Sequence, residues 1–241
     1  METKQGRSVQ EATRETTNFY KTFAANGGEL YLAEIKRFAV GLYDPMVKNL
    51  INSLAIAPQS SILDLGCGVG NIEEEILTQY PDSHITCVDN TPEMIEATRE
   101  RLERFETQPT LMCVDILSLQ PEKSFSTVFS NLAIHNLSIA EKKRLLTKIQ
   151  SWLEANGTFV WGDFMEFEDK KLGEQIMKER KKAVLQSDGA DPNFVHEILD
   201  KESEDERLTM TETIALLTEI GFTNVETVWH EKFLAVLKCK I

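Results

Sequence analysis

The stretch "ILDLGCGVGNIEEEIL", residues 62–77, joins two segments of different periodicity through three glycines. The first segment is an apolar run that contains one acid, Asp64, and is typical of a short buried strand. The second places apolar residues at helical spacing. Gly66, Gly68 and Gly70 stand between them, and glycine permits positive φ and lets a ligand approach the backbone. We therefore expect a sharp strand-to-helix turn that faces a ligand.

The same alternation of strand and helix continues along the chain. Strand-like runs cover residues 61–65, 84–89, 110–115, 125–131 and 158–164. Helical segments separate them, and one of these, over roughly residues 139–155, is expected to end at Asn156-Gly157. Strands that alternate with helices indicate a mostly parallel sheet with helices on both faces.

The C-terminal part adds an antiparallel element. After the helical run "TMTETIALLTEIGF", the segments "TNVETVWH" and "KFLAVLKC" predict two strands joined by a tight turn. The fold class is therefore α/β: a doubly wound, mostly parallel, seven-stranded, Rossmann-like sheet with an antiparallel terminal hairpin.

We expect one domain over residues 1–241, made of four parts. These are an N-terminal helical cap (1–58), a cofactor-binding core (59–165), a helical insertion after the fifth strand (166–208) and the terminal helix and hairpin (209–241). The cap contains an aromatic set: Phe19, Tyr20, Phe23, Tyr31, Phe38 and Tyr43. The cap either packs passively on the core or forms a mobile lid over a ligand. We expect the cap and the insertion together to form the acceptor pocket.

Composition limits the function classes. No apolar run approaches the roughly 18 residues that a membrane span needs, and the first residues lack an apolar signal core, so we expect a cytoplasmic protein without a membrane partner. The four cysteines are scattered and have no metal-ligand spacing, so we expect reduced thiols and no metal. The net charge of −13 argues against a broad surface for nucleic acid. A monomer or homodimer is expected.

Three acids stand at the ends of the first three strands and indicate the ligand. Asp64 stands two residues before the first glycine, where it would favour a cationic ligand over a phosphate. Asp89 ends the second strand, where an acid can accept hydrogen bonds from both ribose hydroxyls. Asp115 could accept from an adenine amino group, with the N–H of Ile116 beside it. S-adenosyl-L-methionine, a sulfonium, fits this set better than NAD.

Two other function classes remain as alternatives. An NAD-dependent oxidoreductase would share the fold, but its glycine turn should have the third glycine one residue later. A non-catalytic protein could bind the same cofactor and turn nothing over.

Four motifs in order resemble those of the class I S-adenosylmethionine-dependent methyltransferases: "ILDLGCGVG", "CVDNTPEMIEATRERL", "CVDIL" and "STVFSNLAIHNL". The resemblance covers roughly residues 60–240 and implies methyl transfer to a small-molecule acceptor, with S-adenosyl-L-homocysteine as product. The cofactor site that it implies comprises Asp64, Gly66, Cys67, Gly68, Gly70, Asp89, Asn90, Met94, Asp115, Ile116 and Asn131. His135, just after the fourth strand, is the candidate general base, or else a histidine that lines the acceptor site.

A closer likeness concerns "VDNTPEMIE", "NLAIHNL", "FEDKKLGEQIM" and "LTMTETIALLTEIGF", which are similar to stretches of the carboxy-S-adenosyl-L-methionine synthase family of tRNA wobble-uridine modification. This likeness implies that Tyr43 contacts the cofactor. It also implies an arginine for the extra carboxylate at position 198, where the chain has Ile198, with Lys201 and Arg207 nearby. We therefore expect ordinary methyl transfer and keep the synthase activity, with its tRNA pathway, as the alternative.

Overall fold

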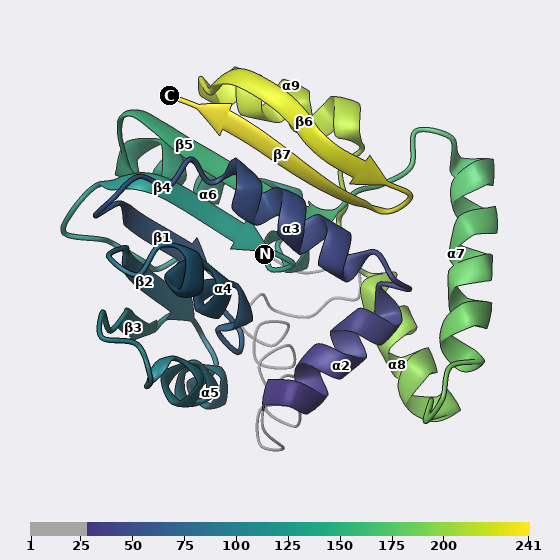
Figure 1. The fold of residues 1–241 in the computed structure, drawn as a ribbon. Helices are drawn as coiled ribbons and strands as arrows, with labels where there is room; N and C mark the ends of the chain where they lie inside the picture. Colours follow the sequence, from purple (N-terminus) through teal and green to yellow (C-terminus); the bar gives the residue numbers. More distant parts are fainter. Residues whose placement is uncertain (1–27) are drawn as a thin grey trace.

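The computed structural model describes residues 28–241, and a single seven-stranded sheet organises them (Figure 1). The strands are β1 (Ser61–Leu65), β2 (His84–Asp89), β3 (Thr110–Cys113), β4 (Phe125–Asn131), β5 (Leu153–Phe164), β6 (Thr223–Glu231) and β7 (Leu234–Lys240). Their order in the sheet is β3-β2-β1-β4-β5-β7-β6. The first five strands pair in parallel, and β7 pairs antiparallel with both β5 and β6. The predicted fold class is confirmed.

Helices cover both faces of this sheet. They are α2 (Gly28–Phe38), α3 (Tyr43–Ser53), α4 (Asn71–Gln79), α5 (Pro92–Leu102), α6 (Ile139–Trp152), α7 (Lys170–Leu185), α8 (Pro192–Glu202) and α9 (Met210–Ile220), with a short 3-10 helix, η1 (Ile134–Asn136). Over residues 28–241, none of them combines the length and the apolar character that a bilayer-spanning helix requires.

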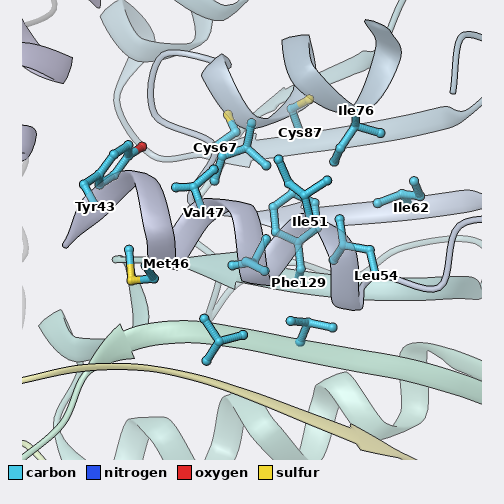
Figure 2. Close-up of a cluster of buried hydrophobic side chains, with 14 of the residues drawn as sticks. Tyr43, Met46, Val47, Ile51, Leu54, Ile62, Cys67, Ile76, Cys87 and Phe129 are labelled. Carbon is cyan, nitrogen blue, oxygen red and sulfur yellow. The ribbon is translucent and has the colours of Figure 1, made fainter. Parts of the chain in front are cut away.

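Two apolar clusters fill the space between the sheet and its helices. On one face, α3, α4 and α5 pack on the sheet, and Figure 2 shows side chains of α3, such as Met46 and Ile51, in one cluster with Ile62 of β1 and Phe129 of β4. On the other face, α6 and α9 pack on alternate residues of the same strands, for example Leu63 of β1. The strands are therefore buried on both sides, as parallel strands usually are.

Two predicted boundaries are wrong. The helix over 139–155 ends at Trp152, and β5 begins at Leu153 rather than at residue 158. Leu153 takes an extended conformation and pairs with Phe125 of β4, so tertiary pairing overrides the helical spacing. The third strand ends at Cys113, which leaves Asp115 in the loop beyond it.

The helical parts outside the core meet beyond the carboxyl end of β4 (Figure 1), where α2, α7 and α8 lie together. Arg180 of α7 joins them. Its Nε donates to the carbonyl of Phe38 at the end of α2, 2.8 Å away, and its two terminal nitrogens donate to the two carboxylate oxygens of Glu202 on α8. A buried, bidentate ion pair thus anchors the insertion to the cap. The predicted cap residues Phe19, Tyr20 and Phe23 lie outside the described residues.

The glycine turn after β1 is held by its neighbours. The N–H groups of Gly66 and Cys67 both donate to the carbonyl of Val88 in β2, at 2.8 and 3.0 Å. Gly66 has φ +93°, and a Cβ built there would lie 2.4 Å from the Cβ of Ala133, just after β4. Gly68 has φ +55°, but a Cβ there would meet only the ring of Tyr31, 3.6 Å away. Both positions favour glycine because their φ angles are positive, and Gly66 is also required because Ala133 leaves no room for a Cβ.

We predict that Gly66→Ala lowers the free energy of unfolding more than Gly68→Ala does. Gly66→Ala adds a clash with Ala133 to the strain of a positive φ, so its free energy of unfolding should fall by about 3 kcal/mol. Gly68→Ala adds backbone strain alone, so its free energy of unfolding should fall by about 1 kcal/mol. Urea unfolding of the two variants beside the unmodified protein measures both losses. Equal losses would show that contact with Ala133 does not constrain the turn.

Candidate functional site

Asp89, at the end of β2, connects its own strand to the glycine turn. Its Oδ2 accepts from the N–H of Gly68 at 3.1 Å, and its Oδ1 accepts from the N–H of Thr91 at 2.9 Å. Burial raises the pKa of Asp89, while these backbone donors oppose the rise. The acid predicted for the ribose therefore lies directly beside the turn predicted for the methionine part.

Asp64 lies in a buried cluster between β1, α3 and α4. Its nearest acid is Glu73 of α4, whose side chain is also fully buried, and within the described residues Asp64 Oδ1 and both Glu73 carboxylate oxygens have no hydrogen-bond partner. Burial, and then the charge of Glu73, raise the pKa of Asp64 well above its usual range. Burial also raises the pKa of Glu73, so this buried pair disfavours two charged carboxylates.

Tyr43 of α3 borders the same cluster. Its phenol oxygen accepts from Asn71 Nδ2 at 3.0 Å, and burial raises its pKa. Sequence reasoning did not identify Glu73, because an acid run at a helix start is typical of an exposed turn. One signal was available: Glu73 stands three and four residues before Ile76 and Leu77, so it shares their apolar face.

The residues predicted for the adenine end lie around the carboxyl ends of β2 and β3. Asp115 Oδ1 accepts from the N–H of Leu117 at 2.9 Å, and Ile116 beside it is partly exposed. Asn90 Oδ1 accepts from the hydroxyl of Thr91. Met94 of α5 is buried and packs with Val69 of the glycine turn, so it lies behind that turn.

The remaining predicted cofactor residues lie at the turn itself and at the end of β4. Cys67 is buried, with its Sγ 3.9 Å from the hydroxyl of Thr98. Gly70, at φ +75°, is the N-cap of α4. Asn131 pairs with Gly162 of β5 in the sheet, and its Oδ1 is buried without a partner among the described residues. The structure thus brings the predicted set to one edge of the sheet, where ligands of open α/β sheets bind.

His135 of η1 forms a dyad with Asp163 of β5. The His135 Nδ1 lies 2.6 Å from Asp163 Oδ1, and the backbone N–H of His135 donates to Asp163 Oδ2 at 2.9 Å. Trp161 Nε1 and the N–H of Phe164 also donate to this carboxylate. Although burial opposes ionisation, His135 and these donors hold the pKa of Asp163 below its ordinary value.

The tautomer of His135 follows from this arrangement. An ionised carboxylate only accepts, so His135 Nδ1 carries the hydrogen, and the neutral ring has Nε2 free to accept a proton. Sequence reasoning selected His135 but did not identify Asp163. The available signal was an acid inside the otherwise apolar strand run "TFVWGDF".

A cavity opens beside this dyad, between α2 of the cap and α8 of the insertion. Its lining includes His135 and an apolar set made of Tyr31, Ile35, Phe38, Phe164, Phe194 and Ile198. Tyr31 also faces Gly68, and Ala133 of the adjoining loop contacts Gly66. The cavity therefore adjoins the glycine turn and is formed by the two segments from which an acceptor pocket is expected.

Position 198 lies in this cavity. Ile198 contributes an aliphatic wall, and Lys201, one turn further along α8, also lines the cavity. Arg207 is not among the lining residues, but it pairs with Asp205 at 3.1 Å and its guanidinium lies over the ring of Phe164, and both of these partners line the cavity. The cation nearest to position 198 on the cavity wall is therefore a lysine.

Sequence comparisons identify relatives of this chain. A family model described as a methyltransferase domain matches residues 62–157. A carboxy-S-adenosyl-L-methionine synthase of Yersinia enterocolitica is 30% identical over 225 residues, covering 88% of this chain and 81% of the relative. The synthase of Sodalis glossinidius is 28% identical over 224 residues, covering 88% and 87%.

Solved structures share the fold at low identity. The N-methyltransferase NodS of Bradyrhizobium japonicum, in complex with S-adenosyl-L-homocysteine, matches with a TM-score of 0.57 and 14% identity, over 82% of this chain and 86% of that one. The magnesium protoporphyrin IX methyltransferase of Synechocystis PCC 6803, with the same ligand bound, matches with a TM-score of 0.61 and 16% identity, over 85% of each chain.

We predict that Asp89→Ala weakens the binding of S-adenosyl-L-methionine by about 1–3 kcal/mol, roughly 5- to 150-fold, because the ribose hydroxyls lose a charged acceptor. Isothermal titration calorimetry measures the change. Asp82→Ala, at an exposed turn before β2, is the control and should bind normally. An unchanged affinity in a folded Asp89→Ala protein would remove Asp89 from the site.

A second prediction concerns the Asp64–Glu73 pair. Because folding raises the pKa of both acids, the unfolded chain releases these protons at lower pH, and stability is lost as pH rises above the usual carboxyl range. Glu73→Gln should therefore melt at a higher temperature than the unmodified protein at pH 8, with a smaller difference at pH 5. Glu75→Gln, on the exposed face of α4, should change neither melting temperature. A pH-independent effect of Glu73→Gln would contradict the raised pKa of Glu73.

Proposed function

We propose that this chain, which belongs to the carboxy-S-adenosyl-L-methionine synthase family, is a transferase that binds S-adenosyl-L-methionine at the glycine turn. In this proposal it methylates a small acceptor in the adjoining cavity. The observation that carries the proposal is the His135–Asp163 dyad, whose histidine lines the cavity that adjoins the glycine turn. A base and an apolar pocket beside the cofactor edge are what a methyl transfer to a protonated nucleophile needs.

The site residues fit the cofactor. Gly68 leaves open space where a side chain would stand, and the buried Asn131 Oδ1 has no partner among the described residues. Asp89 would accept from the ribose hydroxyls, while Asp115 and the N–H of Ile116 would bind the adenine. The cofactor supplies an electrophilic methyl group on a sulfonium.

The protein contributes alignment and proton removal. The cavity wall would hold the acceptor beside the cofactor and exclude water, and alignment of two reactants can supply about 7–11 kcal/mol of an acceleration. His135 Nε2 takes the proton that the acceptor loses. Asp163 remains ionised and stabilises the imidazolium that forms.

The second candidate is the activity that the relatives are named for. It is favoured by 30% identity over most of the chain and by Lys201 on the cavity wall. Ile198 weighs against it, because a hydrocarbon side chain cannot pair with an added carboxylate, and lysine offers a point charge rather than a bidentate fork. The mass of the cofactor-derived product separates the two: S-adenosyl-L-homocysteine for methyl transfer, a carboxylated sulfonium for the synthase.

We also propose a cytoplasmic location. The supporting observation is that all four cysteines are free thiols and that Cys67, Cys87 and Cys239 are buried, as is typical of proteins in a reducing compartment.

We predict that His135→Gln lowers kcat by about 10²- to 10⁴-fold and leaves the affinity for S-adenosyl-L-methionine unchanged. Asp163→Asn should also lower kcat, because the imidazolium that forms during proton transfer loses its counter-charge. Release of S-adenosyl-L-homocysteine across a pH series, with calorimetry on each variant, measures these effects. Full turnover by His135→Gln would assign this histidine to packing alone.

A further inference from the structure

We infer that Tyr31 of α2 is a further cofactor-binding residue, whose ring contacts the sulfonium end of S-adenosyl-L-methionine and separates it from the cavity. The inference rests on the proposed function and assigns a residue to that same site. Three sets of contacts carry it: those between α2 and the glycine turn, those of the ring with Gly68, and those that put the same ring in the cavity wall.

The first turn of α2 packs directly on the glycine turn. Gly28 begins this helix, and a Cβ built on it would lie 2.8 Å from the Cβ of Val69. Arg101 of α5 joins the two segments, because its Nε donates to the carbonyl of Val69 at 2.8 Å and its guanidinium pairs with Glu29. The position of Tyr31, two residues after Glu29, is therefore fixed relative to the glycine turn.

The ring of Tyr31 borders the space beside Gly68. Among residues 28–241, and apart from the chain neighbours of Gly68, its Cε1 is the only atom within 4 Å of a Cβ built on that glycine, at a distance of 3.6 Å. The ring also packs with Val69 and Met94. A ligand that approaches the backbone of Gly68 therefore meets this ring.

The same ring lines the cavity in which the acceptor is proposed to bind. Leu132 lines the cavity too, and it directly follows Asn131, the predicted contact of the methionine part. Leu132 has φ +52°, a conformation that is uncommon outside glycine and that clusters at functional sites. The boundary between the cofactor site and the cavity is therefore formed by Tyr31 of α2 and Leu132 of the loop after β4.

The charge of the cofactor gives the ring at this boundary a distinct effect. The methyl group leaves the sulfonium for an acceptor in the cavity, so the sulfonium binds where the two spaces meet. When the carbon–sulfur bond breaks, sulfur keeps the electron pair, and the product S-adenosyl-L-homocysteine is a neutral thioether. An aromatic ring attracts a cation through its quadrupole and does not attract a neutral sulfur in this way. Tyr31 therefore favours the charged cofactor over its product.

The test is isothermal titration calorimetry of the full-length protein with S-adenosyl-L-methionine, S-adenosyl-L-homocysteine and sinefungin, an analogue with an ammonium group in place of the methyl group and no sulfonium. Tyr31→Leu keeps an apolar side chain and removes the ring. It should weaken the binding of the two cationic ligands roughly five- to thirtyfold and that of S-adenosyl-L-homocysteine about twofold or less. Tyr31→Phe keeps the ring and should retain all three affinities within about twofold.

Tyr80→Leu is the matched control. Tyr80 stands at the opposite end of α4 from the glycine turn and is 39% exposed, so its replacement should leave all three affinities unchanged. Thermal melting of each variant measures how well the fold is retained. The ratio of two affinities within one variant does not depend on the fraction of folded protein, so it remains informative in a destabilised variant.

The outcomes separate this inference from the proposed function. An equal loss of affinity for S-adenosyl-L-methionine and S-adenosyl-L-homocysteine in Tyr31→Leu would assign the ring to apolar packing and overturn the inference. Unchanged affinities would also overturn it, as would a gain in both, because the ring would then occupy the space of the ligand. If the unmodified protein binds none of the three ligands, the cofactor site of the proposed function is itself overturned.

Discussion

Two hydrogen bonds from the N–H groups of Gly66 and Cys67 to the carbonyl of Val88 hold the end of β1 against β2, and the rest of the site depends on them. They fix the turn so closely to the loop after β4 that no side chain fits at Gly66. Asp89 then reaches the N–H of Gly68 from the neighbouring strand. The cofactor edge is therefore made by backbone geometry inside the sheet, and its acids occupy positions that the strand order imposes.

The acceptor side is built by a different kind of interaction. Its walls, α2 and α8, lie outside the sheet and are joined through the buried ion pair between Arg180 and Glu202 and through the bond from Arg180 to the Phe38 carbonyl. Such a pair contributes little net stability, but breaking it leaves an uncompensated buried charge. The relative placement of cap and insertion is thus specified by a few charged contacts together with the small apolar cluster of Phe38, Val184 and Val195.

Local periodicity was enough to predict the sheet, the glycine turn and the acids that follow β1 and β2, because each depends on residues close together in the chain. It could not predict the start of β5, where pairing of Leu153 with Phe125 decides the conformation. Nor could it identify Asp163, which meets His135 from 28 positions away, or the burial of Glu73 beside Asp64 that raises the pKa of both acids. These features depend on which buried polar groups face one another after folding.

The small core under α8 has an evolutionary consequence. Phe38, Val184 and Val195 pack together apart from the two clusters that bury the sheet, and Ile198 stands on the same helix at the cavity wall. Substitutions on the cavity face of α8 can therefore change which molecules enter without disturbing the strands or the turn that holds the cofactor. An exchange of side chain at position 198 would therefore alter the surface that an entering molecule meets and leave the cofactor turn as it is.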